Sequence, residues 1–223
     1  MNRILKSALF GLSLLVFSNT TLKAQEHPPF WQDIQAIKQY DRVYEPPKNP
    51  ILFVGSSSIR LWVDFTKTFK DYTVLNRGIG GAVTADIDRY LEDIVFPYQP
   101  KQIVLYIGEN DLLEASNAEQ VFKSIKKLYT DIRTRLPEVP IIYLAIKGSP
   151  SRSKEFNKAI ETNRLVNNYL IDKNNAIFID VFTPMLDKKG EMNPSIFKAD
   201  QLHMNASGYA IWNKLLVPHL LKD

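Results

Sequence analysis

The chain contains no cysteine. This absence excludes disulfides, a thiol nucleophile and a lipid attached to cysteine, so the folded protein is held together by packing alone. Histidine is also scarce, with three residues among 223 that lie far apart in the sequence. Because zinc sites need clustered histidine, cysteine or carboxylate side chains, we predict no metal. The glycines around Gly78 lack the G-x-G-x-x-G order of dinucleotide sites, so no cofactor is predicted either.

Long runs of basic residues are missing as well. Lysine and arginine never occur more than two in a row, and aromatic residues do not alternate with them as on a nucleic-acid surface. The first 24 residues hold three of the 28 basic residues and no acidic one, which leaves 25 basic against 24 acidic residues in the rest. The remainder is close to neutral, and nucleic acid is not an expected partner.

One long apolar run is present, from Ala8 to Phe17, and it follows Arg3 and Lys6. A bilayer-spanning helix needs about 20 apolar residues, roughly twice this length. A basic start, a short apolar run and a small residue before polar sequence are typical of a secretory signal peptide. We therefore expect residues 1–24 to be removed, with a mature protein that begins near Gln25, is periplasmic or secreted, and keeps no membrane anchor.

The rest of the chain predicts one domain. Residues 25–49 are proline-rich and read as an irregular lead-in with one short helix around Trp31–Tyr40, and residues 50–223 form the domain itself. Within it, short apolar runs predict buried strands. They are Ile51–Val54, Thr73–Leu75, Gln102–Ile107, Ile141–Ile146 and Ala176–Val181.

The segments between these runs carry apolar residues at helical spacing. They are Ile87, Leu91 and Ile94; Val121, Ile125, Leu128 and Ile132; and Phe156, Ile160, Val166 and Leu170. A final helix is expected to start at Asn205 as its N-cap and to run towards Leu221. Strands that alternate with amphipathic helices predict a three-layer α/β/α, flavodoxin-like fold with a five-stranded parallel sheet.

Ligands of such folds bind at the carboxyl ends of the strands. The residues that follow the first three predicted strands are unusual, as is a segment just before the final helix. These four blocks are Gly55-Ser56-Ser57-Ser58, Asn76-Arg77-Gly78-Ile79-Gly80-Gly81, Gly108-Glu109-Asn110-Asp111 and Asp200-Gln201-Leu202-His203.

The four blocks resemble those of the SGNH, or GDSL-type, esterase family and occur in the family's order from Ile51 to Tyr209. The family has Asp where this chain has Ser56, which leaves three consecutive serines as candidates for the nucleophile. Families of this type often carry Trp seven residues after the glycine of the first block, and Trp62 fits that spacing. The resemblance then implies Ser57 as the nucleophile. It also implies that the oxyanion is bound by the backbone N–H groups of Ser57 and Gly81 and by the side chain of Asn110.

The histidines support the same site without the resemblance. A serine nucleophile needs an adjacent base, usually histidine, that a third group orients. His27 lies in the lead-in and His219 near the chain end, where it is expected to face solvent, so His203 remains. Asp200, three residues earlier, can reach its ring within one turn. The alternative is that both residues merely cap the following helix.

Other interpretations stay open. The glycines from Gly78 to Gly81 can simply form a tight turn with positive φ, and Asn110 and Asp111 an Asx turn. Glu109 could pair with Asp111 or Asp200 for glycoside hydrolysis, although this leaves Ser57 and His203 unused. The favoured function is a serine ester hydrolase that removes small acyl groups, acetyl from a carbohydrate by family analogy. A lipase or lysophospholipase-like acylhydrolase, or a non-catalytic binding module, are the alternatives.

Overall fold

The computed structural model describes residues 27–222, so the predicted signal peptide lies outside the described part. Its centre is one parallel sheet with the strand order β2-β1-β3-β4-β5. The strands are β1 (Ile51–Gly55), β2 (Val74–Gly78), β3 (Gln102–Tyr106), β4 (Ile141–Leu144) and β5 (Ala176–Ile179). Each lies within or overlaps a predicted run, and the order is that of a flavodoxin-like fold, which confirms the predicted fold class.

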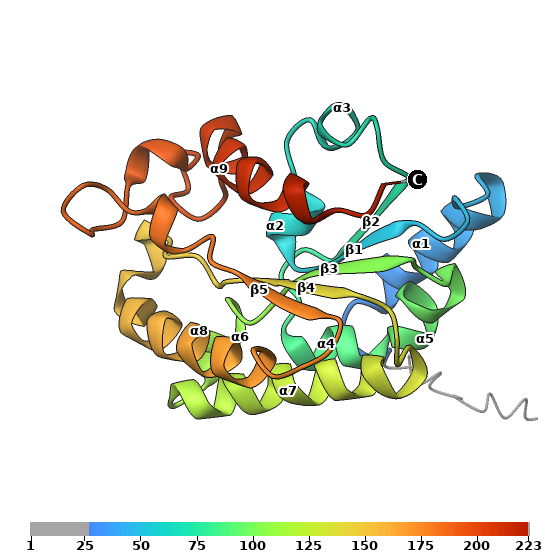
Figure 1. Ribbon diagram of the computed structural model, residues 1–223, viewed down its shortest axis with the longest axis horizontal. Coiled ribbons are helices and arrows are strands. Elements are labelled where there is room, and N and C mark those ends of the chain that lie inside the picture. Colours follow the sequence, from blue (N-terminus) through green and yellow to red (C-terminus); the bar gives the residue numbers. More distant parts are fainter. Residues whose placement is uncertain (1–26, 223) are drawn as a thin grey trace, which may run out of the picture.

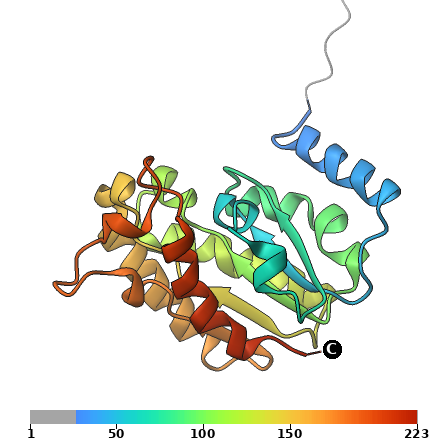
Figure 2. The same cartoon turned by 90° about the horizontal axis from the view of Figure 1, so that it is seen from above.

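Helices cover both faces of the sheet and give three layers (Figure 1, Figure 2). One face carries α4 (Thr84–Arg89), α5 (Leu91–Ile94), α7 (Ala118–Arg135) and α8 (Phe156–Leu170). The other face carries α2 (Ser57–Arg60), α3 (Phe65–Thr68) and α9 (Ala206–Leu216). The short α6 (Asp111–Glu114) follows β3. The 3₁₀ helices are η1 (Phe96–Tyr98), η2 (Pro150–Glu155), η3 (Thr183–Met185), η4 (Pro194–Ile196) and η5 (Val217–His219).

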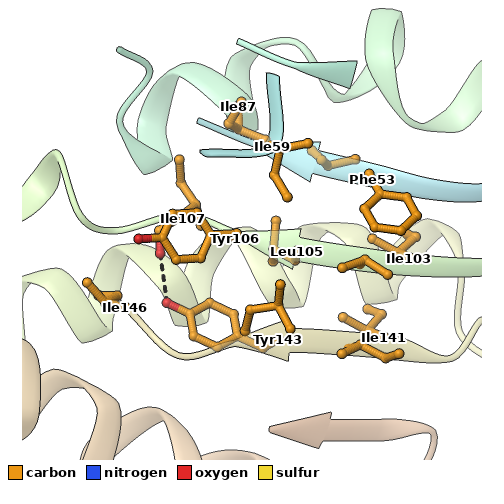
Figure 3. Packing of buried hydrophobic residues seen from close by; sticks show 14 of the residues in the cluster. Phe53, Ile59, Ile87, Ile103, Leu105, Tyr106, Ile107, Ile141, Tyr143 and Ile146 are labelled. Atoms are coloured by element: carbon orange, nitrogen blue, oxygen red, sulfur yellow. Dashed lines mark hydrogen bonds between the residues drawn. The ribbon is translucent and has the colours of Figure 1, made fainter. Parts of the chain in front are cut away.

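The inner strands of the sheet are its most buried part. All residues of β1 and β3 are buried, and their aliphatic and aromatic side chains pack against those of β4 and of the flanking helices (Figure 3). The Tyr143 hydroxyl donates a hydrogen bond of 2.7 Å to the carbonyl of Ile107, which Figure 3 marks with a dashed line. This bond holds the chain in place where it leaves β3, just before the third motif block.

The edge strands are less buried than predicted. Val74 and Leu75 of β2 are partly exposed, and Ile177 of β5 is exposed. The physical reason is topological: an edge strand has a neighbour on one side only, so the covering layers do not close over it completely. An apolar run by itself does not reveal which strand will lie at an edge.

Two details of the predicted helices are wrong. Ile160 is exposed, and Asn163 takes the buried position on α8. Its side chain bonds both the N–H and the carbonyl of Ile146, at 2.8 Å each. These bonds replace a strand partner, which explains why β4 stops two residues earlier than predicted. The final helix α9 stops at Leu216 because Pro218 lacks the N–H that would continue it.

The lead-in is less irregular than expected, since α1 (Trp31–Val43) occupies more than half of residues 27–49. Its Ile34 is buried in the core. Its Asp41 accepts hydrogen bonds from the buried Arg77 guanidinium and from the Tyr98 hydroxyl. Arg77 also donates to the Tyr98 oxygen at 2.7 Å, so the three side chains form one network between α1, β2 and η1.

Candidate active site

Ser57 is the first residue of α2, directly after β1. The turn depends on Gly55, whose φ is 146° and whose place leaves no room for a side chain. A Cβ there would lie 1.8 Å from the carbonyl oxygen of Tyr106 on the neighbouring strand. The same oxygen accepts the Ser56 N–H at 3.2 Å, which fixes the chain as it turns into the helix. The register of β1 and β3 pairs Gly55 with Tyr106, so this close approach follows from the sheet itself.

The three serines have different environments. Ser56 and Ser58 are each 1% exposed, whereas Ser57 is only half-buried. The Oγ atom of Ser57 lies 2.9 Å from Nε2 of His203. The Ser58 hydroxyl is buried without a partner. Ser57 is therefore the serine of this block that is both accessible and paired with a base.

His203 lies between Ser57 and Asp200. Its Nδ1 is 2.7 Å from Oδ2 of Asp200, while its Nε2 faces the serine. The other carboxylate oxygen of Asp200 accepts the backbone N–H groups of Leu202 and His203, both at 2.9 Å. The hydrogen bond from the His203 ring, followed by these backbone bonds, holds the pKa of the Asp200 carboxyl well below its usual range. The carboxylate therefore stays ionised and orients the imidazole.

The helix-cap interpretation of Asp200 and His203 is wrong, because Asn205 caps α9. Its side chain accepts the N–H groups of Ser207 and Gly208 at 2.9 and 3.2 Å. The Asn205 amide also donates to the carbonyls of Ser195 and Phe197, which ties the loop before the helix to η4.

Trp62 anchors the segment after Ser57 against α9. It is buried, its Nε1 donates to Asn213 at 3.1 Å, and its ring packs on those of Tyr209 and Trp212. The Tyr209 hydroxyl in turn donates to the carbonyl of Ser58 at 2.9 Å. The helix that begins just after His203 is thus bonded to the helix that begins at Ser57.

The glycines of the second block have separate roles. Only Gly81 has a positive φ, 84°, so the prediction of positive φ for the whole turn is wrong for Gly78 and Gly80. Gly78 instead allows the backbone of α2 to approach closely, because a Cβ there would lie 2.3 Å from the backbone nitrogen of Arg60. Gly81 is exposed, and its conformation is one that side-chain-bearing residues rarely adopt.

The third block is bonded to the second. Asn110 donates from Nδ2 to the carbonyl of Ala82 at 2.9 Å. Both carboxylate oxygens of Asp111 accept the N–H of Thr84 at 3.1 Å, so Asp111 holds the start of α4 rather than forming an isolated Asx turn. Burial raises the pKa of the Asp111 carboxyl, and the bond from Thr84 only partly offsets it. The loop that contains Gly81 and the loop that contains Asn110 are therefore held together.

Glu109 does not form a catalytic carboxylate pair. It is buried and accepts Lys147 Nζ at 2.5 and 2.6 Å, the Ser149 hydroxyl at 2.6 Å and the Tyr106 hydroxyl at 2.8 Å. Burial raises its pKa, but these donors outweigh that effect and leave the pKa below its ordinary value. Every oxygen of Glu109 is thus occupied within the protein, which leaves no basis for the glycoside hydrolase alternative.

The motifs of the sequence do not include three further residues that contact this region: Lys147, Ser149 and Arg152. Lys147 has a fully buried side chain, and Arg152 donates to Oδ1 of Asn110 at 2.9 Å and to the carbonyl of Glu109 at 3.2 Å. One signal was available: Lys147 directly follows the apolar run Ile141–Ile146, where a charged residue at the carboxyl end of a buried strand needs a partner.

The two histidines other than His203 were not expected to belong to the site. His27 stacks on Trp31, and His219 is exposed as expected, so neither joins Ser57. Within residues 27–222, no three His, Asp or Glu side chains are grouped as metal ligands would be. In the same range, no helix has the length and apolar character that crossing a membrane requires.

Comparisons with known proteins agree with this geometry. The model of the GDSL-like lipase/acylhydrolase family matches residues 54–211, more than half of the chain, while no curated protein sequence matches. A Bacteroides fragilis structure described as an acylhydrolase has a TM-score of 0.73 at 22% identity and covers 85% of this chain and 96% of its own.

Two further solved structures are similar in fold. One from Streptococcus pneumoniae, described as a platelet activating factor, has a TM-score of 0.74 at 21% identity and covers 85% of this chain and 92% of its own. An acetylxylan esterase of Geobacillus stearothermophilus has a TM-score of 0.65 at 14% identity, with 79% and 96% covered. The structural similarity to these proteins shows the fold alone, and the family match establishes the class of protein. The chain belongs to the GDSL-like lipase/acylhydrolase family and is a carboxylic ester hydrolase.

Proposed function

We propose that this hydrolase acts through an acyl-enzyme on Ser57. The observation that carries the proposal is the bonded series Ser57 Oγ, His203 Nε2, His203 Nδ1 and Asp200 Oδ2, with separations of 2.9 and 2.7 Å. A serine hydroxyl becomes a nucleophile when such a base takes its proton as the new bond forms. Asp200 keeps the imidazole oriented and stabilises its positive charge.

The proposed reaction has two halves. Ser57 Oγ bonds to the ester carbonyl carbon while its proton moves to His203, and the carbonyl oxygen becomes an anion. The bond to the alcohol oxygen then breaks, and His203 gives that oxygen its proton. In the second half, water attacks the acyl carbon and gives a proton to His203. The bond to Ser57 Oγ then breaks, Oγ takes the proton from His203, and the acid leaves. One ester and one water thus give one acid and one alcohol.

The anionic oxygen needs preorganised donors. We assign the backbone N–H groups of Ser57 and Gly81 and the Nδ2 group of Asn110 to this role. Two features support the assignment: Gly81 and Asn110 lie on loops that are bonded through Ala82, and the amide nitrogen of Asn110 carries a second hydrogen beyond the one given to Ala82.

We propose a small acyl group, acetyl on a carbohydrate, as the substrate. The similarity to an acetylxylan esterase supports this choice. No long apolar insertion that could form a lipase lid stands between the four blocks of the sequence.

A series of aryl esters tests the acyl preference. We expect kcat/KM to be highest for the acetyl ester and at least about tenfold lower for the long-chain ester. A tenfold difference corresponds to about 1.4 kcal/mol of transition-state stabilisation. Acetylated sugars then test the alcohol side, with Ser57→Ala as the inactive control. A preference for long-chain esters would favour the lipase or lysophospholipase alternative. A wild-type protein that hydrolyses none of the esters would favour the binding module.

We also propose that the protein is exported to the periplasm or secreted, because residues 1–24 have the order of a signal peptide. N-terminal sequencing of the exported protein tests this. A chain that starts at or near Gln25 supports the proposal, and exported protein that still starts at Met1 contradicts it.

A further inference from the structure

Arg152, in η2, is bonded to the side chain that we assign to the oxyanion. Its Nη2 donates to Oδ1 of Asn110 at 2.9 Å, and its Nη1 donates to the carbonyl of Glu109 at 3.2 Å. The guanidinium therefore holds the side chain of one residue and the backbone of the residue before it. Two bonds from one planar group define a direction as well as a distance.

These contacts leave the Asn110 amide one orientation. A guanidinium only donates and a carbonyl only accepts, so Arg152 must face Oδ1 and Ala82 must face Nδ2. A flipped amide would point N–H groups at the guanidinium and its oxygen at a carbonyl. The observed orientation leaves the second Nδ2 hydrogen unused by Ala82. A cation bonded to Oδ1 also draws electron density from the amide and strengthens that hydrogen as a donor.

The residue before Asn110 is anchored through its side chain. The side chain of Glu109 is fixed by Lys147, whose side chain is fully buried, and by Ser149. Both belong to the segment between β4 and η2, directly before the helix that contains Arg152. Removing either partner of this buried ion pair would leave the other charge unpaired, so the pair keeps the Glu109 side chain in place.

The helix η2 also contacts the loop that contains His203. The N–H of Ser151 donates to the carbonyl of Gln201 at 3.0 Å, and Gln201 lies between Asp200 and His203. The turn at Ser151 and Arg152 thus touches both the loop of the general base and the loop of the anion donor.

We propose that Arg152 is a positioning residue for ester hydrolysis: it fixes the Asn110 amide so that its second Nδ2 hydrogen points to the anionic oxygen. This inference rests on the proposed function, since it assumes that Asn110 binds that oxygen. Arg152 acts through Asn110 and not on the substrate itself. Its loss therefore affects the transition state more than ground-state binding.

A double-mutant cycle on an acetyl ester tests the proposal. Loss of one oxyanion donor lowers kcat about 10²- to 10³-fold, which sets the limit for a residue that acts through that donor. We expect Arg152→Gln to lower kcat about 10- to 100-fold with KM nearly unchanged. Arg152→Lys, which keeps the charge but not the two-pronged geometry, should recover part of the loss. Arg152→Gln combined with Asn110→Ala should be no slower than Asn110→Ala alone.

The matched control is Arg164→Gln, which breaks an exposed pair with Glu161 on α8. It should leave kcat and KM unchanged, and thermal unfolding of each variant reports on folding. If Arg152→Gln fails to fold, Arg152→Lys takes its place in the cycle. Effects that multiply in the double variant, or a change in KM alone, would overturn the inference while leaving the proposed function intact. A wild-type protein without esterase activity would overturn the proposed function first.

Discussion

At the scale of single residues, the charge of Asp200 is set by its bonds and not by burial. Its side chain is 47% exposed, yet three N–H groups converge on its two oxygens. Its pKa lies below the ordinary value of 3.8. A lowered carboxyl pKa means that the charge is present above that value and is lost only as the pH falls further. Across the pH range above 3.8, Asp200 is therefore a constant anion beside His203.

This constancy gives a prediction for Asp200→Asn. In the wild type, protonation of Asp200 should not contribute to any change in kcat/KM above pH 3.8, because its lowered pKa keeps the carboxylate ionised there. The variant keeps the shape of the side chain but loses the charge, so kcat should fall by about 10- to 1000-fold, less than in His203→Ala. Steady-state kinetics from acid to neutral pH measure both quantities.

Asp187→Asn is the matched control, since Asp187 also accepts two backbone N–H groups, at 2.8 and 2.9 Å, in an exposed turn. It should behave as the wild type. An Asp200→Asn variant as fast as the wild type would contradict the assigned role.

The site was predictable where its residues lie in local motifs. Ser57, Asp200 and His203 each follow from a short motif, and the structure brings them within hydrogen-bond distance. The contacts of Arg152 with Asn110 and of Lys147 with Glu109 join residues about forty positions apart, at |i−j| of 42 and 38. No local pattern encodes such a pairing, so the support of Asn110 became visible only in the folded chain.

At the scale of elements, α1 is attached to the domain by a buried ionic network. Asp41 accepts from Arg77 and Tyr98, and burial together with the bond to Asp41 raises the pKa of Tyr98 to about 12. The phenol therefore stays protonated and donates across the neutral pH range. Arg77 is buried, and its guanidinium is paired with the Asp41 carboxylate.

Asp41→Ala should therefore destabilise the protein markedly. An unpaired buried charge costs about 3 kcal/mol, which for a chain of this size lowers the unfolding midpoint by roughly 6–12 °C. Thermal unfolding followed by circular dichroism measures the shift. Glu161→Ala, which removes an exposed ion pair with Arg164, should leave the midpoint unchanged. Equal midpoints for the two variants would show that the network does not hold α1.

The sequence predicts which segments are helices or strands better than it predicts where they end. Val121, Ile125, Leu128 and Ile132 are all buried on α7, as their spacing predicts. The ends depend on single atoms instead: the Asn163 amide takes over the bonds of Ile146, and Pro218 lacks an N–H. Such details are decided by partners that periodicity does not describe.

At the scale of the whole molecule, the parallel sheet assembles the site. Because all five strands are parallel, the residues after β1, β2 and β3 meet at the carboxyl ends of the strands. There Gly55 pairs with both Gly78 and Tyr106. The fourth block, which contains Asp200 and His203, lies just before α9. This helix is bonded to α2, since the Tyr209 hydroxyl donates to the carbonyl of Ser58. The order of strands and helices therefore places Ser57 and His203 side by side across 146 positions.

The central claim is that Ser57, activated by His203, is the nucleophile. The most direct measurement is peptide mass spectrometry after reaction with an organophosphorus reagent that labels activated serines. We expect one label per chain, on Ser57, and no label in His203→Ala or Ser57→Ala. A label on Ser56 or Ser58, or ester hydrolysis by a wild-type protein that takes up no label, would contradict it.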